Sequence, residues 1–362
     1  TRTAELELLK SSKAWRLAEF LRRVIYRFIP PPNTRPAQAL SAAEQLQRPV
    51  STPRERLAVA LHDEAKDFEY SGLATSSDPI ISVVMPVHNT PKPWLVDAVG
   101  SLSAQTYPHW QLVIVNDGST KLETREFLDR INDPRVTVFP LTRGVGISAA
   151  TCMGIDASQG EYLAFMDHDD MLAPQALQKV AEVIKEKSPD VLYTDESAFS
   201  DETEAKVYGF FGAPHLKPDF SPDLLLCHNY ITHLLVVRKS FVDIVGGPRS
   251  EFDGAQDFDF LLRLTEKTNK IEHIAEPLYH WRQSAQSTSL DTGAKPQAHS
   301  RGAQALNEAL DRRGIEGEVL TANAPHFFRV RRRIIGNPSV TIIIPFRDQP
   351  HLLQKCLRST LT

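Results

Sequence analysis

The stretch EYLAFMDHDDML, residues 161–172, runs from apolar residues directly into three carboxylates. Asp167, Asp169 and Asp170 repel one another and are costly to desolvate unless a cation neutralises them. Short carboxylates at a strand end suit Mg²⁺ or Mn²⁺, which prefer oxygen ligands and often bind phosphates as well. The structural alternative is that Asp170 caps the next helix and the other two are solvated. Because that alternative accounts for only one carboxylate, we predict a divalent metal site.

Around this stretch, short β-rich runs alternate with segments able to form helices. The runs are IISVVMP (80–86), WQLVIVND (110–117), RVTVFP (135–140) and EYLAFMD (161–167). This alternation predicts an α/β protein with a mostly parallel central sheet and helices on both faces. Ligands bind beyond the carboxyl ends of such strands. Three runs end there in polar residues, so we expect one shared site made of His88 and Asn89, Asn116 and Asp117, and the acidic cluster.

The segment NDGST, residues 116–120, follows the second run. Asp-Gly is a common turn dipeptide, so a simple turn is one interpretation. Because the segment follows a buried strand of the same sheet, we expect Asp117 to accept hydrogen bonds from a ribose or base and Gly118 to allow close approach. The sequence has no phosphate-binding P-loop and no GxGxxG fingerprint. We therefore expect the metal to hold the phosphates.

Composition and charge exclude some classes of protein. The 362 residues carry a formal charge of −4, which argues against a nucleic-acid-binding protein built on a basic surface. Three widely separated cysteines form no CxxC pair and show no spacing typical of zinc, so a reducing compartment is the simpler interpretation. No run of the sequence approaches the roughly 20 apolar residues that span a bilayer.

The N-terminal part differs in composition from the rest. Residues 1–29 show apolar residues at helical spacing with arginines on the other faces, which predicts a basic amphipathic helix. Such a helix packs on its own domain, rests on an anionic membrane surface or contacts a partner. Residues 30–78 begin with a stretch rich in Pro and Ala, which predicts a linker, and a short helix follows it.

One internal repeat bears on the number of domains. ISVVMPVHNTPKPWLVDAVGSLSAQTY (81–107) is echoed by VTIIIPFRDQPHLLQKCLRSTLT (340–362), and each copy has an apolar strand, a proline, a polar pair and a helix. The second copy holds only one strand and one helix. We therefore interpret residues 339–362 as the truncated start of a second domain similar to the main domain at 79–335. A chance match of a common pattern is the alternative.

Seven motifs over residues 79–290 closely resemble, in order, the family-2 glycosyltransferases, in particular those of bacterial O-antigen and capsule assembly. The motifs are SVVMPVHN, VIVNDGST, RGVGISAAT, AFMDHDDMLAPQAL, LKPDFSPDLLLCHNYITHLLVVRKS, VGGPRSEFDGAQDFDFLLRLTE and PLYHWRQSAQSTS. The resemblance implies the A-type glycosyltransferase fold, an inverting hexosyltransferase-type reaction, a nucleotide-sugar donor and a saccharide or lipid-linked acceptor. It also implies a cytoplasmic location, peripheral to the inner face of the plasma membrane if the N-terminal helix binds there.

The resemblance also implies roles for individual donor-site residues. The positions that hold the nucleotide base and ribose correspond to Pro86, His88, Asn89 and Asp117, with His88 where a tyrosine is more usual. Asp167 and Asp169 match the DxD motif, which binds the ribose or the diphosphate through Mn²⁺ or Mg²⁺. The other expected donor-site residues are Gly118, Arg143, His168 and the additional acid Asp170.

Asp257 matches the catalytic base of the family, within GAQDFDF, where Gln256 replaces a more common glutamate. Inverting transfer needs a base opposite the leaving diphosphate, which takes the proton of the acceptor hydroxyl. Asp257 begins a predicted helix, where a carboxylate tends to stay ionised. The structural alternative is that Asp257 or Asp259 only caps this helix.

The segment YHWR, residues 279–282, is similar to a family segment that closes over the diphosphate. By this resemblance His280 is expected to join the metal ligands. Gln256, Trp281 and Arg282 are candidates for contact with the acceptor or the diphosphate. Core packing is the alternative for Trp281, and a plain surface position is the alternative for Arg143.

Two other functions compete with glycosyl transfer. A sugar-phosphate nucleotidyltransferase is expected to show a Gly-rich basic loop after its first strand, where this chain has PVHNTPKPW. A non-catalytic sugar-binding or scaffold module of a multidomain polymerase is expected to lack the DxD acids or the base, and both are present. We therefore predict a metal-dependent glycosyltransferase of surface polysaccharide assembly, with a second glycosyltransferase domain in the full-length chain and no nucleic-acid partner.

Overall fold

The computed structural model describes residues 78–200, 214–283, 296–322 and 324–361. The predicted amphipathic helix at 1–29 and almost all of the predicted linker at 30–78 lie outside the described residues. Among the helices that are described, none is long and apolar enough to cross a membrane.

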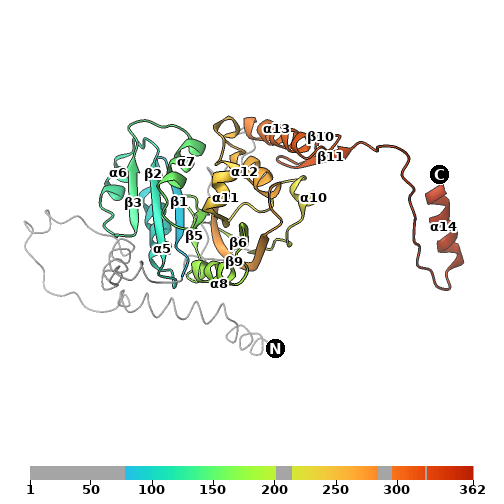
Figure 1. The fold of residues 1–362 in the computed structure, drawn as a ribbon, viewed down its shortest axis with the longest axis horizontal. Coiled ribbons are helices and arrows are strands. Elements are labelled where there is room, and N and C mark those ends of the chain that lie inside the picture. Colours follow the sequence, from blue (N-terminus) through green and yellow to red (C-terminus); the bar gives the residue numbers. More distant parts are fainter. Residues whose placement is uncertain (1–77, 201–213, 284–295, 323, 362) are drawn as a thin grey trace, which may run out of the picture.

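An α/β domain with helices on both sides of a central sheet makes up most of the described chain (Figure 1). Its first part alternates strands and helices as the sequence predicts: β1 (Ile81–Val87), α5 (Lys92–Ser103), β2 (Trp110–Asn116), α6 (Leu122–Asp129), β3 (Val136–Pro140), α7 (Ile147–Ala157) and β4 (Tyr162–Phe165). Its second part is less regular: β5 (Met171–Leu172), α8 (Ala176–Lys187), β6 (Val191–Ser200), β7 (Pro214–His215), α10 (Pro222–Leu225), β8 (Leu235–Arg238), α11 (Lys239–Val245), the short 3₁₀ helix η2 (Ser250–Phe252), α12 (Gln256–Thr265) and β9 (Ile271–Gln283). The helix α13 (Pro296–Arg312) and the hairpin of β10 (Gly317–Thr321) and β11 (Phe328–Arg332) follow.

The main sheet has the strand order β3-β2-β1-β4-β8-β6-β9-β5, and β7 pairs with β6. All pairs from β3 to β4 are parallel, so the loops after β1, β2 and β4 meet at one edge. The other half is mixed, because β8 runs antiparallel to both β4 and β6 while β6 and β9 run parallel. The α/β fold is confirmed, and its all-parallel part is confined to the first half of the sheet.

The two-residue strand β5 brings two parts of the site together. β5 directly follows the acidic cluster and pairs with β9, so that Met171 lies opposite His280 and Leu172 lies opposite Tyr279. This pairing carries the YHWR segment to the acidic cluster, across 109 residues of sequence between Asp170 and Tyr279.

Two hydrophobic cores cover the two faces of the sheet. In β1, Ile81, Val83 and Met85 belong to the core that α5, α6 and α8 cover. The neighbouring Val84 belongs to the other core, which residues of α7, α11, α12 and α13 complete. Because successive strand residues face opposite sides, this division follows from the apolar run of β1, and the expected helices on both faces are confirmed.

The C-terminal segment leads away from the domain after β11 and ends in α14 (Pro350–Leu361) (Figure 1). Its apolar residues Ile335, Val340 and Ile343 are 71%, 81% and 86% exposed, whereas Ile81 at the start of β1 is fully buried. The helix of the repeat is formed, but residues 338–346 form no strand, since a strand needs a neighbour to complete its hydrogen bonds.

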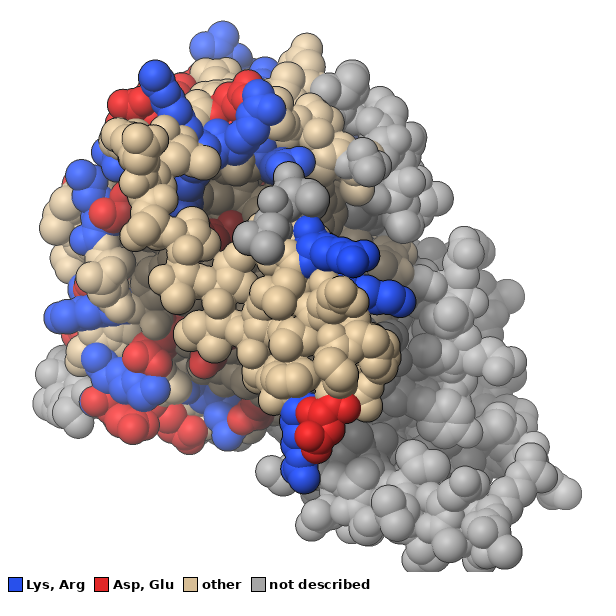
Figure 2. Space-filling view, turned by 90° about the vertical axis from the view of Figure 1, so that its right-hand side faces the viewer, with Lys and Arg blue, Asp and Glu red and all other residues tan. Residues whose placement is uncertain are grey.

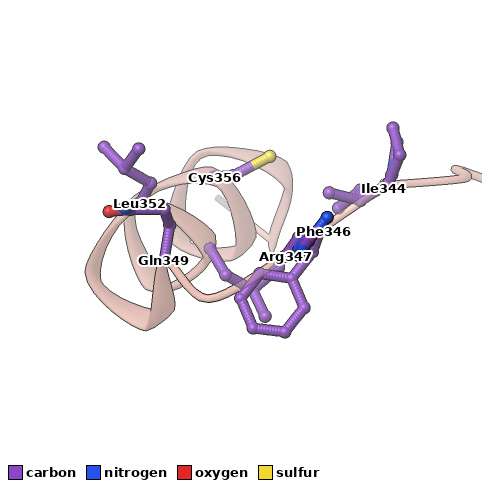
Figure 3. Close-up of a pocket in the computed structure, with 8 residues that line it drawn as sticks. Ile344, Phe346, Arg347, Gln349, Leu352 and Cys356 are labelled. Carbon is purple, nitrogen blue, oxygen red and sulfur yellow. The ribbon is translucent and has the colours of Figure 1, made fainter.

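The described part of this segment is strongly apolar on its outside. Ile344, Phe346 and Leu352 line a hollow between the extended stretch and α14 (Figure 3). Figure 2 views the molecule from this end and shows uncharged residues over the centre of the face. The extended apolar stretch and α14 are uncovered, and the second domain stays a prediction.

Candidate active site

Three loops at the carboxyl edge of the sheet hold one another in place. The buried Asp117 carboxylate accepts the backbone N–H groups of Val145 (2.6 Å) and Gly146 (3.1 Å) in the loop after β3. His88 Nδ1, in the loop after β1, donates to the backbone oxygen of Asp117 at 2.7 Å. We expected Asp117 to accept hydrogen bonds from a ribose or base, and the structure shows that both of its oxygens already order the rim of the site.

Two residues of these loops, Gly118 and Asn89, have a left-handed backbone conformation. Gly118 has a φ of +63°, and a Cβ there would collide with the backbone of Arg143 and Gly144. We expected Gly118 to let a ligand come close. In the structure, the backbone of Arg143 and Gly144 packs closely against Gly118. Asn89, with a φ of 53°, accepts the N–H groups of Thr120 (2.7 Å) and Lys121 (2.9 Å) through Oδ1.

The remaining residues expected at the donor site differ in accessibility. His88 and Arg143 are exposed at the rim, whereas Pro86 and His168 are half-buried. His168 Nδ1 lies 3.7 Å from Asp169 Oδ1, so this histidine belongs to the acidic turn. The structure thus gathers all of the predicted donor residues along one edge, and their contacts with a donor stay predictions.

The three carboxylates of the acidic turn have different surroundings. Asp167 is exposed and Asp169 is half-buried, whereas Asp170 is only 1% exposed. The oxygens of Asp170 accept the Tyr279 hydroxyl at 2.6 Å and the Arg282 backbone N–H at 2.7 Å. The same Tyr279 hydroxyl accepts the backbone N–H of Asp167 at 3.1 Å. One buried hydroxyl therefore positions both Asp167 and Asp170.

Burial and mutual repulsion both act on the carboxylates at this edge. Burial raises the pKa of Asp170 well above its ordinary value, and the charges of Asp167 and Asp169 add to the rise. Burial also raises the pKa of Asp169, with the nearby His168 acting in the opposite direction. A bound cation relieves both the desolvation and the repulsion of such carboxylates.

Arg282 holds the acidic turn from inside the protein. Its side chain is 1% exposed, and its guanidinium donates to the backbone oxygen of Asp169 (2.6 Å) and to Asp97 (2.8 Å). We expected contact with the acceptor or the diphosphate, but burial on β9 gives Arg282 a positioning role instead. Its neighbour Trp281 packs against the first hydrophobic core, as its structural alternative predicted.

His233, which was not predicted from the sequence as a site residue, lies beside the acidic turn. His233 Nε2 lies 3.6 Å from Asp167 Oδ2, and the His233 ring stacks on Tyr279 with centroids 4.6 Å apart. Its Nδ1 lies 3.3 Å from Glu196 Oε2. Burial alone lowers the pKa of His233, but its hydrogen bonds to Asp167 and Glu196 outweigh burial and raise the pKa well above its ordinary value.

Glu196 is in turn held by a buried cation. The Lys217 ammonium, whose side chain is fully buried, lies 3.1 Å from Glu196 Oε2, and the Thr232 hydroxyl donates to the same oxygen at 3.1 Å. Burial alone raises the pKa of Glu196, but hydrogen bonds from His215 and His233 outweigh it and lower the pKa far below its ordinary value. Glu196 is therefore ionised at neutral pH and fixes the orientation of the His233 ring.

The described side chains that could share a cation are Asp167, Asp170 and His233, whose ligand atoms all lie within 4.8 Å of one another. Two carboxylates and an imidazole fit Mn²⁺ and are acceptable to Mg²⁺. Asp169 lies beside this group. His280, the expected histidine ligand, is instead buried with Nδ1 hydrogen-bonded to Ser197 at 2.8 Å, and burial lowers its pKa to about 4.

Asp257, at the start of α12, is an exposed residue whose carboxylate is partly enclosed by neighbouring protein groups. Its carboxylate accepts the Asn229 side-chain amide at 3.1 Å and the Phe258 N–H at 2.9 Å. The surrounding protein desolvates the carboxylate and raises its pKa, while the charge of His233 lowers the pKa and that of Asp167 raises it. Asn229 also accepts the backbone N–H of Thr232 at 3.3 Å, and Thr232 directly precedes His233, so Asp257 lies near the acidic edge.

The other polar residues of α12 have structural roles. Asp259 is fully buried and pairs with Arg249 and Arg263, each through an Nε–Oδ2 distance of 3.0 Å. Gln256 Oε1 accepts the N–H of Gly254 at 2.6 Å. The N-cap residue of α12 is Ala255, so neither Asp257 nor Asp259 is the cap that the alternative proposed.

Four residues of this arrangement were not predicted from the sequence, namely Asn229, His233, Glu196 and Tyr279. Three of them lie inside the motifs HNYITHLL and YHWR, on which the resemblance rests. The resemblance assigned no role to these three positions. Glu196 lies in TDES (194–197), inside β6, and a pair of acids is the only signal that this segment offers.

Comparison with known proteins identifies the family of this domain. The profile of the family described as Glycosyl transferase family 2 matches residues 82–243. The O-antigen biosynthesis protein RfbC of Myxococcus xanthus is 38% identical over 289 residues, which are 79% of this chain and 22% of that protein. Hyaluronan synthase of Pasteurella multocida is 26% identical over 241 residues, 66% of this chain and 24% of that protein. The chain thus spans less than a quarter of the length of either relative.

A solved structure shares the fold. The crystal structure of S. aureus TarS 1-349 in complex with UDP-GlcNAc gives a TM-score of 0.53 at 18% sequence identity, over 64% of this chain and 67% of that one. The profile match includes β1, β2, β4 and the acidic turn. The chain therefore contains a glycosyltransferase family 2 domain with the A-type glycosyltransferase fold.

Proposed function

We propose that this domain transfers a sugar from a nucleotide-sugar donor to a hydroxyl group of a saccharide or lipid-linked saccharide, with inversion at the anomeric carbon. The observation that carries the proposal is an accessible carboxylate, Asp257, near an acidic edge that contains Asp167 and Asp169. The names of RfbC and hyaluronan synthase support polysaccharide as the product. The UDP-GlcNAc complex of TarS supports a nucleotide-sugar donor.

Asp257 acts as the general base of this reaction. It takes the proton of the acceptor hydroxyl while the hydroxyl oxygen forms a bond to the anomeric carbon. The bond from that carbon to the diphosphate oxygen breaks, and its electron pair leaves with the nucleoside diphosphate. Attack from the face opposite the leaving group inverts the configuration. The raised pKa of Asp257 makes it a stronger base than an ordinary aspartate.

The acidic edge holds the leaving group. Asp167, Asp170 and His233 would hold Mn²⁺ or Mg²⁺, with Asp169 beside them. When bound, the cation neutralises charge that develops on the nucleoside diphosphate. Tyr279 and Arg282 keep the acidic turn in place through the buried hydrogen bonds described above. The loops after β1 and β2, with His88, Asn89 and Asp117 at the rim, face the nucleotide in this proposal.

The test is release of nucleoside diphosphate from a panel of nucleotide sugars with Mn²⁺, Mg²⁺ or chelator. We expect Asp257→Asn to lower kcat about 10²–10⁴-fold with little change in donor KM. We expect Asp169→Asn to weaken donor binding. Asp243→Asn, at an exposed position of α11, is the matched control and should behave as wild type.

Two outcomes contradict the proposal. Turnover at the wild-type rate in the presence of chelator, and in the variants at Asp257 and Asp169, would refute the proposed mechanism. Donor binding without any turnover by the wild-type protein would instead support a non-catalytic sugar-binding module.

A further inference from the structure

An aromatic cluster next to Asp257 takes no part in the steps above. The Phe327 ring, 44% exposed, stacks on half-buried His228 with centroids 4.5 Å apart and an interplanar angle of 30°. His326, which precedes Phe327, is also exposed. Both residues belong to the turn that joins β10 to β11. They present a flat, uncharged surface to solvent.

Two sets of contacts fix this turn beside the base. The backbone N–H of Phe328 donates to the backbone oxygen of Cys227 at 2.7 Å, and the Phe328 ring stacks on Phe258 with centroids 6.3 Å apart. Phe258 follows Asp257 directly, and Asn229, two residues after Cys227, donates to the Asp257 carboxylate. The same short segments thus hold the aromatic turn and orient the base.

Electrostatics supports the proximity. Burial lowers the pKa of His326, and the charge of Asp257 acts on His326 in the opposite direction. Burial also lowers the pKa of His228. Both imidazoles are therefore neutral at neutral pH. Neutral imidazole and phenyl rings offer stacking faces beside a carboxylate, a combination typical of sites that bind a ligand with one apolar face and a polar edge.

We propose that Phe327, backed by His228 and flanked by His326, is the platform on which a pyranose ring of the acceptor stacks while its hydroxyl reaches Asp257. This inference rests on the proposed function, since only transfer to a hydroxyl requires an acceptor ring next to the base. A pyranose presents C–H groups on its face and hydroxyls at its edge, which matches an aromatic surface bordered by a carboxylate. The nucleotide and diphosphate belong to the acidic edge, so the acceptor is the partner left for this platform.

The experiment combines kinetics with direct binding. The donor that wild-type protein consumes is paired with a panel of methyl pyranosides as acceptors, and saturation-transfer NMR measures contact of the same pyranosides with the protein. We expect Phe327→Ala to raise acceptor KM about tenfold, with donor KM and acceptor-independent nucleotide release unchanged. Phe327→Tyr should restore binding, whereas Phe327→Leu, which keeps apolar volume without a ring, should not. Phe346→Ala removes a phenylalanine that is 53% exposed in the C-terminal segment and is the matched control.

The outcomes separate this inference from the proposed function. Unchanged acceptor KM and unchanged NMR contacts in Phe327→Ala overturn the platform while leaving the transferase intact. A rise in donor KM instead assigns the ring to the donor and overturns the inference as well. If wild-type protein releases no nucleotide from any donor, the proposed function fails, and loss of pyranoside contacts in Phe327→Ala still decides whether the platform binds sugar. Absence of contacts with every pyranoside in wild type also overturns the platform.

Discussion

Tyr279→Phe removes a single oxygen atom from the centre of the site. That hydroxyl donates to Asp170 at 2.6 Å and accepts the N–H of Asp167 at 3.1 Å. The phenyl ring that remains can still stack on His233, as Tyr279 does with centroids 4.6 Å apart. The substitution therefore isolates the two hydrogen bonds that position the acidic turn.

The magnitude follows from the groups that lose their partner. A hydrogen bond to a charged group contributes about 1.5–3 kcal/mol, and an ordinary one contributes about 1 kcal/mol. Asp170 is 1% exposed, so water cannot replace the lost donor, whereas Asp167 is exposed and its N–H is more easily solvated. We expect a loss of about 3 kcal/mol in the free energy of unfolding, which lowers Tm by about 6–12 °C for a domain of this size. Displacement of the two ligands should also weaken Mn²⁺ binding about 10–100-fold.

Tyr162→Phe is the matched control. The Tyr162 hydroxyl, in a residue 1% exposed, donates to the backbone oxygen of Pro189 at 2.8 Å. Arg238 donates to the same oxygen at 2.9 Å, so Pro189 keeps a partner and the expected cost is only about 1 kcal/mol. Differential scanning fluorimetry and Mn²⁺ titration calorimetry measure the two effects. Equal Tm shifts in the two variants, together with wild-type Mn²⁺ affinity in Tyr279→Phe, would refute the role given to this hydroxyl.

Five further expectations follow from charges and exposure. Asp259→Asn should lower the free energy of unfolding by about 3 kcal/mol, because it removes the buried negative charge that Arg249 and Arg263 share, although Arg249 keeps Glu308 at 2.8 Å, while kcat of the folded protein stays near wild type. Because desolvation raises the pKa of Asp257, kcat should fall, as the pH is lowered, at a higher pH than an ordinary aspartate near 3.9 would give. The raised pKa also means that ionisation of Asp257 costs stability as pH rises through it, so Asp257→Asn should melt no lower than wild type at pH 7. Glu196→Gln should weaken Mn²⁺ binding about 10–100-fold in calorimetry, because His233 loses the charge that orients it. Deletion of residues 336–362 should leave the Tm of the main domain unchanged and reduce self-association in light scattering, because the deleted segment exposes apolar side chains.

The parallel half of the sheet and its edge could be predicted from the sequence. Apolar runs with polar residues directly after them predict strands whose carboxyl ends carry the site, and His88, Asp117 and Asp167 do lie along that edge. The assignment of Asp257 came from the resemblance, because no periodicity brings position 257 to position 167. The structure connects the two positions through the segment 229–233, because Asn229 donates to Asp257 and His233 lies 3.6 Å from Asp167.

The mixed half could not be predicted, because antiparallel pairing is not visible in single runs. β8 pairs with β4 so that Leu235 lies opposite Phe165, which places residues just before β8 beside residues just after β4. His233 reaches Asp167 for this reason. Similarly, β9 lies between β6 and the two-residue β5, and a strand of two residues has no detectable period. The polar residues His280 and Arg282 are therefore buried, although their motif favoured contact with a ligand.

The two acids of α12 show how one short motif can serve stability and catalysis together. Asp257 and Asp259 are two positions apart, and at about 100° per residue they point to different sides of the helix. Asp259 faces inward and takes both nearby arginines, which anchors the helix beside the site. Desolvation raises the pKa of Asp257, which has two amide N–H donors and no arginine or lysine among the contacts described for it to offset that rise. An arginine placed at Asp257 would lower the pKa and weaken the base, so the same cation that stabilises α12 at position 259 would impair transfer at position 257.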